Sequence, residues 1–231
     1  MFIIPKKEGT VRFIAEHCRL NQKLVRKLYP LPRIGDSLQK LEGFQYATEL
    51  DLNKGYYTIR LSPASQDMTT IVTKFGKFKY NYLPMGMYAS GDIFQSKAEK
   101  ILGDIEGVKT YIDDVIVLGK DSFENHIEQL IIIFGRLSAA SLKANVLKCS
   151  FGLKEIPYLG YVITREGIKP HPKKVQGIIY LGRSSTTTEA RWIIGMVQYY
   201  RYMCPRRSHV LAPLTEAASC PKGRKYFGMA H

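Results

Sequence analysis

The stretch Tyr111-Ile112-Asp113-Asp114 constrains the fold more than any other part of this sequence. It places two adjacent carboxylates between two β-prone runs, residues 107–110 and 115–119. This pattern predicts a β-hairpin with the aspartates at or beside its turn. The isolated Asp51 ends another apolar segment, residues 46–50. If these segments pair in one sheet, three carboxylates converge and supply the oxygen ligands that Mg²⁺ requires.

The Asp-Asp pair also has a simpler interpretation. Aspartate is common in tight turns, because its side chain accepts hydrogen bonds from nearby backbone N–H groups. The functional alternative is a carboxylate-held metal pair, which catalyses in-line phosphoryl transfer. The choice between them depends on the motifs that surround the hairpin.

Several short motifs stand in a fixed order along nearly the whole chain. They are residues 2–13, Tyr29-Pro30-Leu31-Pro32, Leu50-Asp51-Leu52, Gly55-Tyr56-Tyr57, Ile59-Arg60-Leu61, Leu83-Pro84-Met85-Gly86, Phe94-Gln95, the Tyr111–Asp114 stretch, Tyr158-Leu159-Gly160-Tyr161, and Gly195-Met196-Val197 with Tyr199-Tyr200. With these motifs the chain resembles the reverse transcriptase domain of gypsy-type long-terminal-repeat retrotransposon polyproteins, whose catalytic hairpin has the form Tyr-x-Asp-Asp. The resemblance implies an RNA-directed DNA polymerase.

The fold that the resemblance implies is α+β, a right-hand polymerase with fingers, a palm made of an antiparallel sheet backed by helices, and a partial thumb or connection. Residues 1–88 would form the fingers, with a first palm segment around Asp51. Residues 89–168 would complete the palm, with the hairpin and the primer grip. Residues 169–231 would form the thumb or connection, truncated before ribonuclease H.

Periodicity and capping signals predict three helices and one further hairpin, around Gly76. The helices begin near Ser90, at Asp121 (where Asp-x-x-Glu resembles a capping box) and after the capping box Thr186–Glu189. Their expected apolar stripes are Ile93, Phe94, Ala98, Ile101 and Leu102; Ile127, Leu130, Ile131, Phe134 and Leu137; and Trp192, Ile193, Met196, Val197 and Tyr200.

The resemblance also assigns roles at the catalytic centre. Asp51 and Asp113 would bind two Mg²⁺ ions, with Mn²⁺ as an alternative, and Asp114 would shape the site and could coordinate weakly. Lys7 and Arg12 would hold the incoming triphosphate. Tyr56 would exclude a ribose 2′-hydroxyl. The alternatives are a basic surface loop for the two cations and a core position for Tyr56.

Two loops complete the expected site. Met85 and Gly86 would pack near the nascent base pair, where a glycine allows close backbone approach. Leu159 and Gly160 would form the primer grip, a hairpin that directs the primer terminus towards the metals. Both segments could also be plain turns.

Charge indicates a nucleic-acid partner. The net charge of +14 is unevenly distributed, with an excess of 5 basic residues in residues 1–60, 1 in residues 61–165 and 8 in residues 166–231. Basic flanks around a nearly neutral centre suit a chain that grips a nucleic-acid duplex. The resemblance implies that the partners are an RNA or DNA template-primer duplex and deoxynucleoside triphosphates. A generally basic, solvated surface is the alternative.

Membrane and metal-cluster functions find no support in the sequence. Apolar runs are far too short to span a membrane, so no membrane partner is expected. The cysteines Cys18, Cys149, Cys204 and Cys220 are widely scattered, which indicates reduced thiols in an intracellular setting. A cytoplasmic virus-like particle and the nucleus both remain open.

Some features depart from the family pattern. Cys18 stands where an arginine is usual, Gly91 replaces a rigid helix start by a flexible one, and the segment 181–185 lacks the usual prolines. The chain also ends before the ribonuclease H and integrase domains expected in a full-length polyprotein, which suggests a fragment or a decaying copy. The alternatives to an active enzyme are a relic that only binds template-primer and a host-recruited interaction surface.

Overall fold

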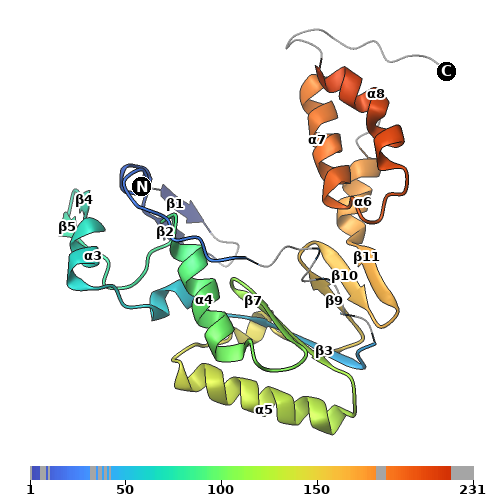
Figure 1. The fold of residues 1–231 in the computed structure, drawn as a ribbon. Helices are drawn as coiled ribbons and strands as arrows, with labels where there is room; N and C mark the ends of the chain where they lie inside the picture. Colours follow the sequence, from blue (N-terminus) through green and yellow to red (C-terminus); the bar gives the residue numbers. More distant parts are fainter. Residues whose placement is uncertain are drawn as a thin grey trace. The chain divides into compact units, whose positions relative to one another are not determined.

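The computed structural model describes residues 2–5, 9, 11–31, 35, 38, 41, 43–180 and 186–219. The chain divides into two compact units (Figure 1). The first comprises residues 1–156 and 165–167, and the second comprises residues 157–164 and 168–231. The expected division into fingers, palm and thumb stays a prediction.

An antiparallel sheet forms the centre of the first unit. Its strands are β6 (Val108–Tyr111), β7 (Asp114–Gly119), β3 (Tyr46–Asp51) and β8 (Ser150–Leu153), in the order β6-β7-β3-β8. β6 and β7 are the hairpin expected around Asp113, and β3 is the strand expected to end at Asp51. The sheet therefore joins two segments that lie about sixty residues apart in the sequence.

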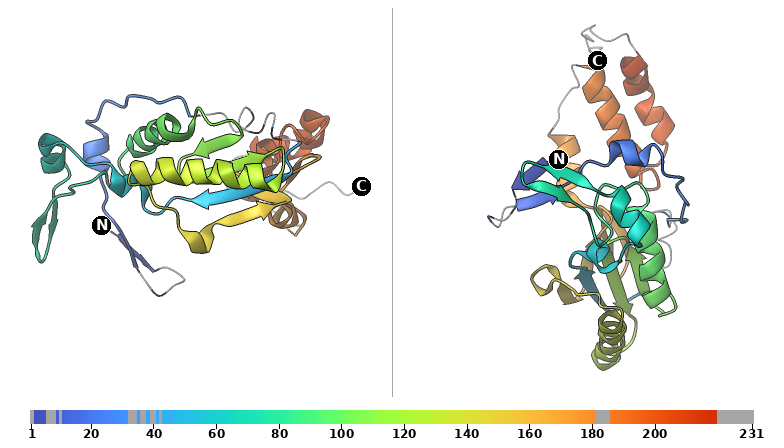
Figure 2. Two further views of the ribbon diagram at one scale, coloured as in Figure 1. Left: turned by 90° about the horizontal axis from the view of Figure 1, so that it is seen from below. Right: turned by 90° about the vertical axis from the view of Figure 1, so that its left-hand side faces the viewer.

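Two helices cover one face of this sheet (Figure 2). Helix α4 (Ser90–Leu102) packs against β6, and α5 (Phe123–Ala139) packs against β7 and α4. Between the helices and the sheet lies a core to which both contribute: Leu50, Leu52, Phe94, Leu102, Val108, Val115, Val117, Leu130, Ile133, Leu137 and Leu142. The burial of this apolar surface is the main force that fixes the sheet against the helices.

The start and the buried face of α5 differ from the sequence prediction. The helix begins at Phe123 rather than Asp121, and its N-cap is Ser122, whose Oγ accepts a 3.2 Å hydrogen bond from the backbone N–H of Asn125. The buried stripe includes His126 and Ile133 in place of three expected residues. Those three, with their exposed fractions, are Ile127 at 39 %, Ile131 at 66 % and Phe134 at 37 %. A helix so rich in apolar residues offers two possible stripes, and tertiary packing selects between them.

The other predicted stripes are partly correct. In α4, Phe94, Ala98 and Leu102 are buried, whereas Ile93 is 42 % exposed. In the third helix, Ile193 and Tyr200 are buried, whereas Trp192 is 47 % exposed. Both errors lie at the edge of the stripe, where periodicity alone does not separate a buried position from a boundary one.

Two small hairpins and several short helices complete the first unit. The hairpins are β1 (Phe2–Pro5) with β2 (Val11–Ile14), and β4 (Ile71–Thr73) with β5 (Gly76–Phe78). The second pair is the hairpin expected around Gly76. The short helices are α1 (Cys18–Asn21), η1 (Gly55–Thr58), α3 (Pro63–Met68) and η2 (Val146–Lys148).

The second unit contains most of a three-stranded sheet and three helices. The strands β9 (Glu155–Tyr158), β10 (Tyr161–Thr164) and β11 (Gly167–Pro170) pair in the order β11-β10-β9. The helices are α6 (Pro172–Ile179), α7 (Thr187–Tyr199) and α8 (Arg207–Ser219). The capping box expected at Thr186 and Glu189 is present at the start of α7. Within the described residues, no helix is both long and apolar enough to cross a membrane.

The unusual Gly91 lies in the first turn of α4, which neighbouring contacts hold in place. The hydroxyl of Ser90 donates to the carbonyl of Pro84 at 2.8 Å, and the buried Asp92 forms an ion pair with Arg26 at 2.5 and 3.0 Å. This guanidinium lowers the pKa of Asp92. The helix start is therefore fixed by side chains on either side of the glycine.

Replacing Gly91 by alanine is expected to stabilise the protein by about 0.5–1 kcal/mol, because glycine carries extra backbone entropy in the unfolded chain. A Cβ at this position meets no atom within 4 Å. Chemical denaturation would measure the gain. The matched control is Gly55→Ala, whose Cβ would lie 2.3 Å from Phe94 Cζ and should destabilise. A destabilised Gly91→Ala protein would contradict the prediction.

Candidate active site

Strand register brings the first and last of the three aspartates together. Asp51 at the end of β3 pairs with Asp114 at the start of β7. Side chains alternate along a strand, and the neighbours Leu50, Leu52 and Val115 face the core under the helices. Asp51 and Asp114 therefore occupy the opposite face of the sheet, away from α4 and α5.

The third aspartate lies in the turn of the hairpin. Tyr111 pairs with Asp114, so Ile112 and Asp113 form a two-residue connection. The backbone N–H of Leu52 donates to the Asp113 carbonyl at 3.1 Å, which ties the turn to the chain just after Asp51. Ile112 has a φ of 55°, a left-handed conformation that costs a β-branched residue about 1–2 kcal/mol. Surrounding contacts must supply that energy.

Gln95 supplies the most specific of these contacts, and sequence reasoning assigned it no role. Its fully buried side chain accepts a 2.6 Å hydrogen bond from the N–H of Ile112. Its Nε2 donates to the carbonyl of Thr110 at 3.0 Å and to the carboxylate of Glu99 at 2.8 Å. A single α4 residue thus holds both β6 and the strained turn. The only sequence signal was its place in the Phe94-Gln95 motif.

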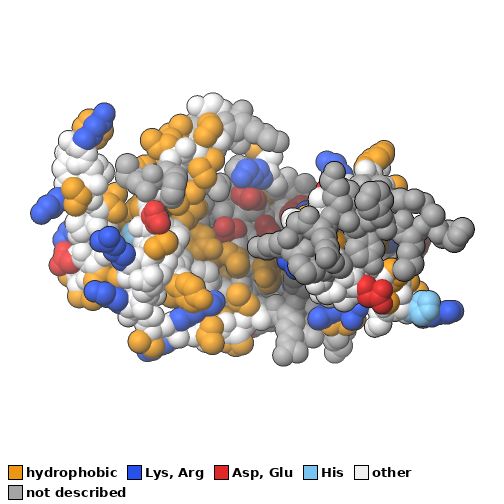
Figure 3. Space-filling model, turned by 90° about the horizontal axis from the view of Figure 1, so that it is seen from above, with side chains coloured by type: hydrophobic (Ala, Val, Ile, Leu, Met, Phe, Trp, Pro, Cys, Tyr) orange, Lys and Arg blue, Asp and Glu red, His pale blue; other side chains and the backbone are white. Residues whose placement is uncertain are grey.

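The carboxylates on this face influence one another. Burial, followed by the negative charge of Asp51, raises the pKa of Asp114. Burial, followed by the charges of Asp114 and Asp51, raises the pKa of Glu49. Lys148 Nζ lies 3.8 Å from Asp51 Oδ2 and partly offsets this negative charge. Figure 3 shows acidic side chains gathered near the middle of one face of the molecule.

The ligand atoms at this site are carboxylate oxygens, the type that a hard divalent cation prefers. Asp51 and Asp114 present carboxylate oxygens from paired positions, and the repulsion that raises the pKa of Asp114 is what a bound cation would relieve. Asp113 adds a further carboxylate one residue away. Among the described residues, however, no three His, Cys, Asp or Glu side chains are grouped closely enough to hold a metal ion as they stand.

Tyr56 lies in η1, shortly after Asp51, and packs against the core. Its ring centroid is 5.2 Å from that of Phe94, and Gly55 allows this close approach because Phe94 fills the space a Cβ would need. Burial, together with the charge of Asp113, raises the pKa of Tyr56 to about 12. Tyr56 is therefore a neutral, half-buried side chain beside the hairpin, and the gate and core interpretations are compatible.

At the loop with Met85 and Gly86, the glycine backbone lies close to the segment after β2, and the expected place beside the nascent base pair stays a prediction. Gly86 has a φ of 89°, and a Cβ there would lie 3.1 Å from the carbonyl oxygen of Ala15. The amide of Asn21 donates to the Gly86 carbonyl at 2.9 Å and accepts from the N–H of Tyr88 at 2.8 Å. These bonds attach the loop to the segment after β2.

Of the two expected fingertip cations, the structure describes only the backbone of Arg12. Lys7 lies outside the described residues. Arg12 lies in β2, where its backbone pairs with Ile4, and its side chain is likewise outside the described part. Their roles stay predictions.

Leu159 and Gly160 form the tight turn between β9 and β10 in the second unit. Their φ values of 47° and 74° are both positive, as in a type I′ hairpin. Two tyrosines bond directly to this turn, and a third bonds to the backbone of one of them. The hydroxyl of Tyr199 donates to the Leu159 carbonyl, that of Tyr200 to the Gly160 carbonyl at 2.7 Å, and that of Tyr161 to the Tyr199 carbonyl at 2.7 Å.

An antiparallel sheet backed by two helices, with aspartates at a central hairpin and at the end of the neighbouring strand, defines the palm of a nucleic-acid polymerase. Comparison with known families agrees. The sequence profile described as "Reverse transcriptase (RNA-dependent DNA polymerase)" matches residues 4–163. This chain belongs to the reverse transcriptase family.

Similar proteins come from retrotransposons. The chain is 31% identical over 230 residues to a Retrovirus-related Pol polyprotein from transposon 297 of Drosophila melanogaster, covering 96% of this chain. It is 33% identical over 222 residues to that from transposon opus and 29% identical over 216 residues to the Transposon Tf2-3 polyprotein of Schizosaccharomyces pombe, covering 93% of the chain in each case. It spans only 21%, 22% and 16% of these relatives. The predicted kinship with gypsy-type elements is confirmed.

Solved structures share the fold. A foamy viral protease-reverse transcriptase in complex with double-stranded DNA superposes with a TM-score of 0.89 at 22% identity, covering 96% of this chain and 39% of that one. The same viral protein in complex with an RNA/DNA hybrid gives 0.84 at 22% identity, covering 96% and 30%. The predicted α+β right-hand polymerase fold is confirmed. Reverse transcriptases generally use divalent metal ions, whereas the individual residue roles stay predictions.

Proposed function

We propose that this chain is an RNA-directed DNA polymerase domain that adds deoxynucleotides to a primer 3′-hydroxyl on an RNA or DNA template. The pairing of Asp51 with Asp114 carries the proposal, because it brings two carboxylates together at one end of the sheet, with Asp113 in the adjacent turn. A plain structural turn would not need a second strand that ends in an aspartate.

Asp51, Asp113 and Asp114 would hold two Mg²⁺ ions, or Mn²⁺ in their place. When bound, such ions neutralise the triphosphate and make the primer hydroxyl more acidic. The protein's own contribution is positioning: Gln95 fixes the turn, and the Asp113 carbonyl is anchored by Leu52. Accurate placement of the reacting groups supplies much of the acceleration in such reactions.

The surrounding residues would bind the substrates. Lys7 and Arg12 are proposed to hold the triphosphate, and Met85 with Gly86 to lie beside the nascent base pair. Leu159 and Gly160 are proposed as the primer grip. The partners would be a template-primer duplex and deoxynucleoside triphosphates, with ribonuclease H and integrase domains in the full polyprotein. We also propose that the protein acts inside the cell.

Tyr56 is proposed to select deoxynucleotides through its ring. Replacing it by valine should raise ribonucleotide incorporation, relative to deoxynucleotide incorporation, by about 10- to 100-fold, the usual range for a steric contact. Tyr56→Phe keeps the ring and should retain the discrimination of the parent chain. Single-nucleotide insertion assays measure both ratios. Equal ratios for the valine and phenylalanine variants would exclude a gating role.

Primer extension tests the proposed function directly. The purified chain would be incubated with an RNA template, a DNA primer, deoxynucleotides and Mg²⁺, with a chelator added to the blank. Metal-dependent extension would establish the activity. Salt-sensitive binding of template-primer with no extension would favour the alternative of a catalytically impaired relic.

A further inference from the structure

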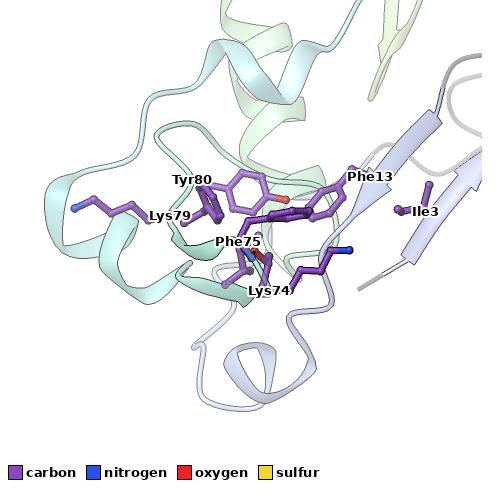
Figure 4. A pocket seen from close by; sticks show the side chains of 9 residues that line it. Ile3, Phe13, Lys74, Phe75, Lys79 and Tyr80 are labelled. Atoms are coloured by element: carbon purple, nitrogen blue, oxygen red, sulfur yellow. Dashed lines mark hydrogen bonds between the residues drawn. The ribbon is translucent and has the colours of Figure 1, made fainter.

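Exposed apolar side chains gather at two places in the first unit. One is a cavity of about 680 Å³ between the two small hairpins, where the rings of Phe13, Phe75 and Tyr80 point towards the same space (Figure 4). Lys74 and Lys79 border this cavity and make it basic. The other place is the outer face of α5, which Figure 1 shows along the edge of the first unit. None of the roles assigned above uses the α5 face.

The outer face of α5 is an apolar stripe made by Ile127, Ile131 and Phe134. These residues recur at spacings of three and four, so they line one side of the helix. Ile131 is the most exposed of them, at 66 %. Phe151 of β8 widens the stripe, because its ring centroid lies 6.5 Å from that of Phe134. A contiguous exposed stripe of this kind generally marks an interaction surface.

Gly135 lies beside this stripe and is unusual there. It occupies the interior of a 17-residue helix, where glycine is less favourable than alanine. Among the described residues, nothing lies within 4 Å of a Cβ placed at this position, so the packing of this chain does not require a glycine. The absent side chain leaves a hollow in which a partner can approach the backbone closely.

The outer face is symmetric about its centre. Ile131 is the middle residue of α5, and Ile127 and Gly135 each lie four residues from it. A two-fold axis at Ile131 would therefore place Ile131 against its own copy in an antiparallel helix. The same axis would place Ile127 of one copy at the Gly135 hollow of the other, so that a side chain of each helix fills a gap in its partner.

Charge also allows two copies to meet at this face. The whole chain carries +14, but residues 121–142 contain three acids and one base. The acids Asp121, Glu124 and Glu128 lie in the first half of this segment, and the exposed Lys143 follows its end. An antiparallel pair brings the acidic end of each helix beside the basic end of the other. The basic hairpin cavity would instead repel a second copy.

We propose that two copies of this chain associate through the outer faces of their α5 helices, antiparallel and related by a two-fold axis at Ile131. The helix is about 25 Å long, so the contact is smaller than a standard interface and gives a weak, reversible dimer. Asp51 and Asp114 lie on the face of the sheet away from α5, so dimerisation leaves them uncovered. The proposal therefore does not rest on polymerase activity.

Sedimentation velocity of the purified chain, without nucleic acid and over a range of concentrations, measures the association. The parent chain should change from monomer to dimer in the micromolar range. Ile131→Lys should weaken the association by about 100-fold, because an apolar contact is lost from both copies at the axis. The matched control is Ile132→Lys. Ile132 is 53 % exposed on the same helix but lies off the stripe, so this variant should dimerise like the parent chain.

A mixture of two variants tests the two-fold axis. Ile131→Lys and Ile131→Glu should each remain monomeric, because each places like charges together at the axis. Mixed in equal amounts they should form a heterodimer, because position 131 of one copy meets position 131 of the other.

Gly135→Gln tests the hollow. Glutamine is a better helix former than glycine, so the variant should melt at a higher temperature than the parent chain when both are dilute and monomeric. Its side chain would occupy the hollow, so dimerisation should nevertheless be weaker. A merely structural role for Gly135 would not produce these opposite changes.

Three results would overturn the proposal. A parent chain that stays monomeric would show that α5 is covered by something other than a second copy. Dimerisation of Ile131→Lys at the parent affinity would place the interface elsewhere. A lysine and glutamate mixture that stays monomeric would exclude the two-fold pairing. Primer extension measures the proposed polymerase function separately from all three.

Discussion

Replacing Asp113 by asparagine is expected to abolish primer extension while template-primer binding is retained. The substitution keeps the size of the side chain and its place in the turn but removes one carboxylate charge from the proposed metal site. Losing about 4 kcal/mol of transition-state stabilisation lowers the rate about 1000-fold. Binding should persist, because basic side chains rather than Asp113 neutralise the phosphates. Extension assays and anisotropy on the same preparation measure the two effects.

The matched control is Asp121→Asn, which makes the same chemical change at an exposed position just after β7. It should extend primers at the rate of the parent chain. Full metal-dependent extension by the Asp113→Asn protein would show that this carboxylate is not a ligand. Loss of both extension and duplex binding would instead assign Asp113 to the structure of the hairpin.

The hairpin at Leu159-Gly160 was expected from the family resemblance alone. The sequence itself was sufficient to predict the central hairpin and the strand that ends at Asp51. Each of these depends on local chemistry: alternation, turn residues and short-range spacing. The pairing of Asp51 with Asp114 is a long-range contact, and it was predicted only as a condition for metal binding. The register that joins them follows from burying Leu50 and Val115 on the same face.

Other features depended on packing that the sequence does not display. The buried face of α5 includes His126, whose ring bonds to the hydroxyl of Thr48 in β3 at 2.8 Å. A histidine on an apolar helix gives no signal of such a partner, so periodicity selected Ile127 and Ile131 instead. Likewise Ser122 and Asp121 are both good N-caps, and only the backbone path decides between them.

The departure at Cys18 also has a structural context. Cys18 is exposed in α1, and a hydrogen bond with Glu16 is the main cause that raises the pKa of its thiol. An arginine at this position would lie beside the same carboxylate. This departure lies in α1, outside the central sheet that carries Asp51 and Asp114.

Gln95 is expected to be as important for extension as the aspartates, although it would touch no substrate. In Gln95→Met, the Ile112 N–H and the Thr110 carbonyl lose their partner inside the protein, which should cost about 2–4 kcal/mol of stability. The strained turn would then relax and move Asp113. The fold decrease in kcat should therefore exceed the fold change in the KM for the nucleotide. Steady-state extension, at a temperature where the variant remains folded, measures this split. Gln129→Met is the control, because the bond from Gln129 to the Glu106 carbonyl is exposed and its loss should change stability by less than about 1 kcal/mol. A Gln95→Met protein with unchanged kcat would show that the hairpin keeps its geometry without α4, and that positioning lies in the Leu52 contact instead.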